Sequence, residues 1–324
     1  MKAKIIAEMC QNHGGSKELL DKMIKSAAAS GASYAKIQGL YSEELVFRKE
    51  FEKKYEDAKS EFFYRPFQHE KNRLEKLDLS PDVEKWFVEK CLEFELIPMI
   101  TVFSHLGVSR ARNAGFKAIK IASYDCGSLA LIQRCAEFAQ ELVISTGATH
   151  WSEIQKTAEF LHKIANKASI TFLHATTLYP TPPQEVNMKK LLLLKSLGFE
   201  IGFSDHTNIE AMDLLAAKTS LILGASLIER HFTILGKQDT RDGAVSLNQI
   251  ELQRLSVIVE RFNNFKKNEE FDELTMRQIA TLLSFDLKTE LSLEETRNRN
   301  YYKGRVASFL NNRQVYSWED WSNE

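Results

Sequence analysis

The sequence predicts an α/β protein built as a (β/α)8 TIM barrel. Eight short apolar runs resemble strands, a stretch of helical length and pattern accompanies each run, and polar residues gather where the runs end. Nearly continuous apolar runs that alternate with helical patterns are typical of parallel strands buried on both faces. Eight such units indicate a closed barrel, and a doubly wound open sheet is the competing architecture.

The repeat can be followed from the N-terminus to about residue 265. The predicted strands cover residues 4–8, 33–38, 97–103, 117–123, 142–146, 169–175, 200–205 and 226–233. The helical stretches that accompany them cover residues 17–31, 82–94, 104–115, 127–139, 151–165, 188–198, 208–219 and 248–262. Ser16 is placed to cap the first helix, and Gly31 is placed to end it. We therefore expect a catalytic barrel over residues 1–265.

Two segments lie outside the repeat. Residues 39–81 form a charged and aromatic excursion after the second strand. A connection of this length is typical of a lid or an interface element, and a solvated helical hairpin is the alternative. Residues 266–324 are too few for a second domain of ordinary size. We expect them to form a short helical tail that packs on the barrel or on a partner subunit.

Composition and charge exclude several classes of partner. The chain has 43 basic and 44 acidic residues, so its net charge of −1 favours neither nucleic acid nor a membrane surface. No apolar run approaches the roughly 20 residues of a membrane span, and the N-terminus lacks a signal-peptide pattern. Cys10, Cys91, Cys126 and Cys135 show no CxxC spacing and no disulfide framework. We expect a cytoplasmic, reduced protein.

His206 and His231 end the seventh and eighth predicted strands. Neighbouring strands lie about 5 Å apart, so the two imidazoles would face one another at a separation that suits one divalent metal. Glu8 and Asp242 are expected nearby, and such nitrogen and oxygen donors suit Mn²⁺, Co²⁺ or Zn²⁺. The alternative is that residues 204–206 form a polar turn without a ligand.

Lys36 lies inside an apolar run, where a buried ammonium group needs an anion from the protein or from a substrate. Hydroxyl groups end several of the other predicted strands: Thr101, Ser123, Ser145, Thr177, Tyr179 and Ser204. An ammonium group with several hydroxyl donors can hold a phosphate, although serine and threonine at strand ends often only cap the next helix. A phosphate site beside a metal with open coordination predicts chemistry on a phosphorylated small molecule.

Seven motifs follow one another in a fixed order: AEMCQNHGG, AKIQ, KIAS, ISTGA, HATTLYPTP, GFSDHT and IERHFT. In this order they resemble the catalytic barrel of the N-acetylneuraminate (sialic acid) synthases, a barrel shared by legionaminic and pseudaminic acid synthases. The match covers about residues 3–250. The resemblance implies a transferase that joins phosphoenolpyruvate to the open-chain aldehyde of a 2-acylamino-hexose such as N-acetylmannosamine. The products would be phosphate and a nine-carbon 2-keto-3-deoxy acid.

The resemblance also implies roles for individual residues. His206 and His231 would hold a divalent cation, Mn²⁺ first, with Mg²⁺ and Co²⁺ as alternatives. The phosphoenolpyruvate contacts would be Lys36, Thr101, Ser123, Ser145, Thr177, Tyr179 and Ser204. The residues around the sugar and the reacting carbons would be Glu8, Gln38, Asp125 and Asp242. Glu8 is our hypothesis for a proton-transfer group, and a homodimer is expected by the same analogy.

The chain departs from the family pattern mainly on the sugar side. The tail lacks the pattern of the family's C-terminal antifreeze-protein-like domain, which delivers an arginine to the partner's sugar site. Arg230, Arg297 and Arg305 are open as substitutes. Asp125 stands where a glutamate is common, and residues 234–246 replace the usual Pro-Gly-Pro-Asp stretch. The acceptor sugar is therefore a separate question from the reaction.

Two other functions remain as alternatives. A lysine on a barrel strand can form a Schiff base, so Lys36 could serve an aldolase that acts on a pyruvate-derived donor. A barrel without turnover that binds a sugar or a partner protein is the other alternative.

Overall fold

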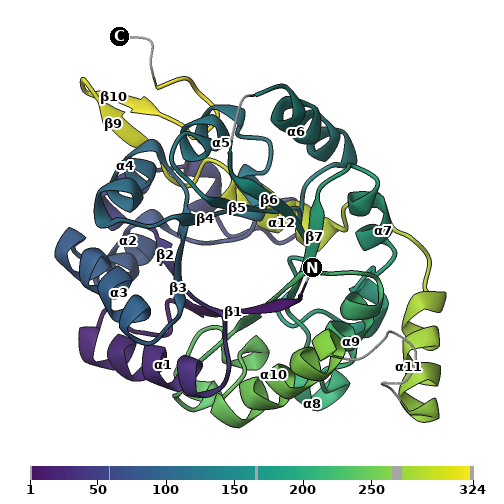
Figure 1. Ribbon diagram of the computed structural model, residues 1–324. Coiled ribbons are helices and arrows are strands. Elements are labelled where there is room, and N and C mark those ends of the chain that lie inside the picture. Colours follow the sequence, from purple (N-terminus) through teal and green to yellow (C-terminus); the bar gives the residue numbers. More distant parts are fainter. Residues whose placement is uncertain (1, 58, 165–166, 265–271, 322–324) are drawn as a thin grey trace.

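The centre of the computed structural model is a closed barrel of eight parallel strands in chain order, with β1 paired to both β2 and β8. The structure describes residues 2–57, 59–164, 167–264 and 272–321. Figure 1 looks into the barrel and shows the ring of strands surrounded by helices. The predicted (β/α)8 barrel is confirmed, and the open-sheet alternative is wrong.

The strands and helices alternate as the sequence predicts. The barrel strands are β1 Lys4–Cys10, β2 Tyr34–Gly39, β3 Ile97–Val102, β4 Ala118–Ile121, β5 Glu141–Ser145, β6 Ser169–Ala175, β7 Glu200–Asp205 and β8 Leu227–His231. The helices around them are α1 Lys17–Ala29, α3 Pro81–Glu93, α4 His105–Ala114, α5 Leu129–Ala136, α6 Trp151–Lys163, α7 Lys190–Lys195, α8 Ile209–Met212, α9 Leu215–Ile222 and α10 Gln249–Asn264. The seventh helical stretch is thus divided between α8 and α9.

The first helix shows why these segments fold locally. The Ser16 side chain accepts a hydrogen bond from the backbone N–H of Leu19 at 3.1 Å, which satisfies one of the free donors at the start of α1. The helix then buries Leu20, Met23, Ile24 and Ala27. This spacing lies on one helical face, so the burial of that face against the outside of the barrel positions the helix.

The inside of the barrel is layered because strand residues i and i+2 face the same side of a sheet. The lowest layer is an apolar cluster of Ile6, Tyr34, Met99, Ala118, Val143, Leu173 and Leu227. Two positions further along these strands lie cavity residues, namely Glu8, Lys36, Thr101, Lys120, Ser145 and Glu229. The next step along the same faces adds Cys10, Gln38, Phe103, Ala122, Thr177 and His231. The apolar layer therefore closes one end of the barrel, and polar layers open towards the other.

Gly202 of β7 leaves room for this apolar layer. A Cβ atom built on Gly202 would lie 2.3 Å from Leu173 Cδ2 and 2.6 Å from the Leu227 carbonyl oxygen. We expect Gly202→Ala to lower the free energy of unfolding by about 1–3 kcal/mol, as overpacking of a core does. Urea denaturation measures the loss. Gly127→Ala is the matched control, because its Cβ would meet nothing closer than 3.6 Å. Equal stability of the two variants would contradict this expectation.

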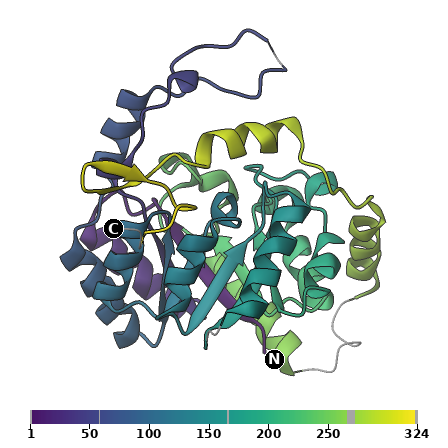
Figure 2. The same ribbon diagram turned by 90° about the horizontal axis from the view of Figure 1, so that it is seen from above.

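The excursion after β2 contains 3₁₀ turns at Ser42–Glu44 and Lys49–Phe51, and the helix α2 Phe67–Glu75. Its described residues form one α-helix rather than two, so the helical-hairpin alternative is wrong. Figure 2 shows the excursion projecting from the end of the barrel opposite the N-terminus. That end carries the carboxyl ends of the strands, so the excursion stands beside the polar layers.

The C-terminal tail packs on the barrel. Helix α11 Glu273–Ser284 lies against α9, and α12 Leu293–Tyr302 lies across the carboxyl end of the barrel (Figure 2). The tail ends in an antiparallel pair, β9 Ser308–Leu310 and β10 Arg313–Val315, so it is not wholly helical as expected. The predicted boundary between residues 265 and 266 lies outside the described residues. No helix that the structure describes has both the length and the hydropathy of a membrane span.

Candidate active site

A cavity of about 410 Å³ lies at the carboxyl ends of the strands. Every site residue predicted from the sequence lines it: Glu8, Lys36, Gln38, Thr101, Ser123, Asp125, Ser145, Thr177, Tyr179, Ser204, His206, His231 and Asp242. The prediction that these side chains share one edge of the barrel therefore agrees with the structure. Their individual roles stay predictions.

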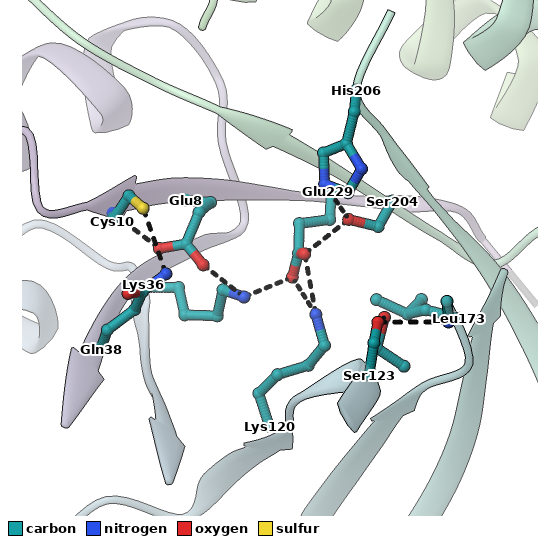
Figure 3. Close-up of polar contacts among 12 residues, drawn as sticks. Glu8, Cys10, Lys36, Gln38, Lys120, Ser123, Leu173, Ser204, His206 and Glu229 are labelled. Carbon is teal, nitrogen blue, oxygen red and sulfur yellow. Dashed lines mark hydrogen bonds and ion pairs between the residues drawn. The ribbon is translucent and has the colours of Figure 1, made fainter. Parts of the chain in front are cut away.

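Lys36 is at the centre of a buried ion network (Figure 3). Its Nζ lies 2.5 Å from Glu8 Oε2 and 2.6 Å from Glu229 Oε2. Lys120 donates to both Glu229 oxygens at 2.7 and 2.8 Å, and the Ser204 hydroxyl donates to Glu229 Oε1 at 2.8 Å. Two ammonium groups and two carboxylates thus balance one another below the cavity. The anion that buried Lys36 needs is supplied by the protein.

The network sets the protonation of its members. Burial opposes the charge of Lys36, yet Glu229 and Glu8 raise the pKa of Lys36 above its usual range. Burial lowers the pKa of Lys120 to about 8, and repulsion by Lys36 acts in the same direction, whereas the Glu229 carboxylate opposes the shift. Burial also opposes ionisation of Glu229, but Lys120 and Lys36 hold the pKa of that carboxyl well below its usual range. Lys36 is therefore a fixed cation, and Lys120 is the cation that loses its proton more easily.

The two predicted metal-binding histidines lie side by side, with their ring centres 5.3 Å apart. His206 Nδ1 lies 2.8 Å from the Thr176 carbonyl oxygen, which can only accept, so Nδ1 carries the proton. Burial and His231 lower the pKa of His206 to about 3, and its Nε2 lies 3.3 Å from the Ser204 hydroxyl oxygen. His231 Nδ1 is buried, has no hydrogen-bond partner among the residues that the structure describes, and lies 3.6 Å from Asp242 Oδ2. Imidazole nitrogens beside a carboxylate fit a divalent cation.

Several of the predicted hydroxyl-bearing residues lie on the wall of the cavity next to the two histidines. Ser123 Oγ donates to Ser145 Oγ at 3.1 Å, and the Gly147 N–H donates to Ser123 Oγ at 3.1 Å. The Thr101 hydroxyl is buried and has no hydrogen-bond partner among the described residues. Hydroxyl donors on this wall, near the Lys36 and Lys120 ammonium groups, make it the side of the cavity that suits an anion.

Asp125 follows β4 and accepts hydrogen bonds at Oδ1 from Ser317 at 2.7 Å and Ser128 at 3.3 Å. Burial raises the pKa of Asp125 to about 6, although both hydroxyl groups act in the opposite direction. Because the folded state binds this proton more tightly than the unfolded chain, the contribution of Asp125 to stability is fully present below about pH 4 and is lost as pH rises through about 6.

We expect Asp125→Asn to raise the free energy of unfolding by about 2–3 kcal/mol at pH 8 and by only about 1 kcal/mol at pH 4.5. Asparagine resembles the protonated acid, so it removes the cost of a buried carboxylate at high pH. Urea denaturation at the two pH values measures the difference, and exposed Asp286→Asn is the control. A gain that does not change with pH would contradict the raised pKa.

Sequence reasoning missed Lys120 and Glu229 as site residues. Both lie on the inward face of their strands, because residues two positions apart in a strand face the same side. Lys120 lies two residues after Ala118, and Glu229 lies two residues before His231. A charged residue inside an apolar run was the signal for Lys36, and the same signal marks these two. Applying it to all eight runs would have found the complete network.

Most of the rim of the cavity was also missed, because it comes from the excursion, the tail and the loop after β8. Buried Glu70 lies 2.8 Å from Arg73, 3.5 Å from Arg305 and 4.0 Å from Arg241. Arg65 donates to the Tyr302 hydroxyl at 3.0 Å. These four arginines and Tyr302 line the cavity, so its rim is rich in cations.

The three arginines proposed to replace the antifreeze-like domain's arginine differ in position. Arg305 lines the cavity. Arg230 is fully buried and pairs with Asp205 at 2.8 Å, so it does not serve the cavity. Arg297 donates to the Ser60 carbonyl oxygen and thereby joins the tail to the excursion. Arg305 is the one of the three whose position fits a sugar contact.

The tail helix α12 is fixed above the strand ends by its own side chains. Asn298 donates to the Thr177 carbonyl oxygen at 2.8 Å, and Arg299 donates to the Ala148 carbonyl oxygen at 2.8 Å. Glu294, Asn298 and Tyr302 line the cavity. The tail therefore forms part of the site within a single chain.

A closed parallel barrel with charged and hydrogen-bonding side chains at the carboxyl ends of its strands is the arrangement of a (β/α)8-barrel enzyme. Residues 23–270 match the sequence profile of the NeuB family. The chain belongs to this family, and it is an enzyme of that family by this match and by its relatives. The family predicted from the seven motifs is confirmed.

Named relatives are similar over most of their length. The N,N'-diacetyllegionaminic acid synthase of Campylobacter jejuni is 30% identical over 259 residues, which cover 78% of this chain and 74% of that protein. A pseudaminic acid synthase of the same species is 27% identical over 312 residues, covering 95% and 82%. The crystal structure of N-acetylneuraminic acid (sialic acid) synthetase from Leptospira borgpetersenii, in complex with citrate, is 25% identical with a TM-score of 0.68, covering 89% of this chain and 94% of that one.

Proposed function

We propose that the chain is a nonulosonic acid synthase that condenses phosphoenolpyruvate with the open-chain aldehyde of a 2-acylamino-hexose. Water adds to C2 of phosphoenolpyruvate, C3 bonds to the aldehyde carbon, and cleavage of the C–O bond releases phosphate. The product is a nine-carbon 2-keto-3-deoxy acid. The observation that carries the proposal is the shared cavity, where the lysine and hydroxyl wall adjoins the histidine pair.

The protein's own groups would divide the work along the cavity. Lys36 and Lys120 supply positive charge near the base, and Ser123, Ser145 and Thr101 supply hydroxyl donors for the phosphate and carboxylate of phosphoenolpyruvate. When phosphoenolpyruvate is held next to the aldehyde, the bimolecular step becomes effectively unimolecular, which lowers the entropic part of the barrier. The cationic rim would then hold the sugar.

His206 and His231 would hold the divalent cation, Mn²⁺ by family resemblance. Two observations support this assignment: His206 uses Nδ1 for a backbone carbonyl, and His231 Nδ1 lacks a hydrogen-bond partner among the described residues. Such a cation, when bound, polarises the aldehyde oxygen. Glu8 lines the cavity and would accept a proton from the attacking water. Its position is fixed, because Oε2 contacts Lys36 Nζ and Oε1 accepts a hydrogen bond from the Cys10 N–H at 2.6 Å.

The Schiff-base alternative receives no support from Lys36. A Schiff base needs a neutral amine, whereas Lys36 lies between two carboxylates that raise its pKa. A barrel that only binds a sugar would not require the buried network of Lys36, Lys120, Glu8 and Glu229. Both alternatives remain as outcomes of the test.

The test is incubation with phosphoenolpyruvate, a divalent cation and a panel of 2-acylamino-hexoses that includes N-acetylmannosamine. We expect phosphate release that depends on both the acceptor and the cation, and a product with the mass of a nine-carbon keto acid. Omission of the acceptor is the control. Trapping of a pyruvate adduct by borohydride would establish the aldolase instead. No phosphate with any acceptor would favour the binding protein.

A further inference from the structure

Cys10 ends β1 beside the histidine pair, and neither the sequence motifs nor the family resemblance gives it a role. One donor atom each from Cys10, His231 and Asp242 lies within 4.8 Å of the other two. We propose that the Cys10 sulfur is a direct ligand of the divalent cation, together with His231 and Asp242. This deepens the proposed function, because the cation is the one assigned there to the two histidines.

The separations suit one ion. Cys10 Sγ lies 2.8 Å from Asp242 Oδ2, and His231 Nδ1 lies 3.6 Å from the same oxygen. With bonds of about 2.0–2.3 Å, one cation would span these pairs at angles of roughly 80° and 120°, within the range of four to six ligands. His206 is not in this triad, and its ring centre lies 5.3 Å from that of His231.

His231 gives the second, independent indication of a ligand. Its side chain is 8% exposed, and its Nδ1 makes no hydrogen bond within the described part of the chain. Buried imidazole nitrogens normally have a partner. A cation between Nδ1, Asp242 and Cys10 supplies the missing partner. His206 already has its Nδ1 engaged by a backbone carbonyl, which is the usual arrangement for a histidine that binds metal through its other nitrogen.

The Cys10 sulfur is held at the cavity by its neighbours. Gln38 Nε2 donates to Cys10 Sγ at 3.1 Å, and Lys36 lies on the neighbouring strand, where it contacts Glu8 (Figure 3). Cys10 has a φ of 52°, and the pairing of β1 with β2 shifts register between Glu8 and Cys10. A left-handed backbone is unfavourable for cysteine, so the fold holds this residue in a conformation that aims its sulfur at the cavity.

The other cysteines provide a contrast within the same chain. Cys91, Cys126 and Cys135 are buried in the core between strands and helices, and none of them lines the cavity. Cys10 lines the cavity and hydrogen-bonds Asp242. Packing alone therefore explains the three core thiols and does not explain Cys10.

A sulfur ligand changes which metal the site prefers. Thiolate is a soft ligand that favours Zn²⁺, Co²⁺ or Fe²⁺ over Mn²⁺ and Mg²⁺. We therefore expect this chain to bind Co²⁺ and Zn²⁺ at least about tenfold more tightly than Mn²⁺. The expectation of Mn²⁺ from the family resemblance would then not hold for this member.

The experiment loads the metal-free protein with Co²⁺ alone and uses no substrate. We expect a thiolate-to-cobalt charge-transfer band in the near-ultraviolet and one sulfur about 2.3 Å from the metal by X-ray absorption. Cys10→Ser should abolish the band, and Cys91→Ser should retain it. Bound Co²⁺ should also protect Cys10 from alkylation. A band that survives in Cys10→Ser, or a metal shell without sulfur in the unaltered protein, would overturn the proposal.

The test of the Cys10 ligand can be distinguished from the test of the proposed function. If cobalt is bound by sulfur but the protein releases no phosphate, Cys10 is a metal ligand and the synthase proposal is wrong. If the protein releases phosphate but the metal has no sulfur ligand, the synthase proposal holds and Cys10 is not a ligand. The X-ray absorption measurement on the unaltered protein decides the question even if Cys10→Ser does not fold.

Discussion

Glu229→Gln is expected to be the most damaging single substitution in the barrel. Three donors converge on this carboxylate, namely Lys36 at 2.6 Å, Lys120 at 2.7 Å and Ser204 at 2.8 Å. Glutamine keeps the shape and removes the charge, so two buried ammonium groups share Glu8 alone. Breaking a buried ion pair from one side typically costs about 3–5 kcal/mol of unfolding free energy. Urea denaturation measures that loss.

The same substitution is expected to lower kcat/KM for phosphate release by about a thousandfold. Lys120 has a pKa already lowered to about 8, so we expect that without Glu229 it loses its proton, and with it a positive charge at the base of the cavity where we propose that the phosphate binds. Glu210→Gln is the matched control, because the Glu210 side chain is 80% exposed and faces Lys237 at the surface. A change below about 0.5 kcal/mol is expected there. A stable, active Glu229→Gln protein would show that the network is dispensable.

His206→Ala is expected to have the next largest effect, through the metal. The Thr176 carbonyl holds the ring through Nδ1, and the ring lines the cavity, so the substitution removes the nitrogen that we propose as a metal ligand. We expect divalent-metal affinity to fall by at least about 100-fold, since loss of an outer partner alone costs about 10–100-fold. Turnover at a fixed metal concentration should fall by about a thousandfold. Titration against a fluorescent chelator measures the affinity, and phosphate release measures the turnover.

His174→Gln is the control for that substitution. His174 is also buried and lies on the neighbouring strand β6, but its Nε2 contacts the Val186 carbonyl oxygen at 2.7 Å, away from the cavity. We expect its metal affinity to match that of the unaltered protein even if its stability falls. Equal metal affinity in His206→Ala and the unaltered protein would remove His206 from the site.

The barrel and the inner site could be predicted because they depend on local periodicity. A strand buried on both faces appears as an apolar run, and polar residues where such runs end meet at one rim once the barrel closes. His206, Lys36 and Ser123 were found in this way. Side chains along a strand alternate with a period of two residues, and this alternation also predicts that Lys120 and Glu229 lie next to the apolar layer. The signal for these two residues was therefore present in the sequence, although they were not predicted.

The rim could not be predicted in the same way. Arg65 and Arg73 belong to the irregular excursion, and Arg305 follows α12 near the end of the chain. Glu70 pairs with Arg73, three residues further along the chain, and with Arg305, which is 235 residues away in sequence. No periodicity relates these segments, because their positions depend on how two loops pack on each other.

The sequence by itself determined the closed barrel, the family and the edge on which chemistry-bearing residues meet, since each follows from patterns within a single strand or motif. The tertiary structure decided which groups touch. It paired Lys36 with two carboxylates, placed Arg230 against Asp205 outside the cavity, and brought Cys10 to His231 and Asp242. The physical reason is that hydrogen bonds and ion pairs depend on distances of a few ångströms between chain segments remote in sequence, which local propensity does not encode.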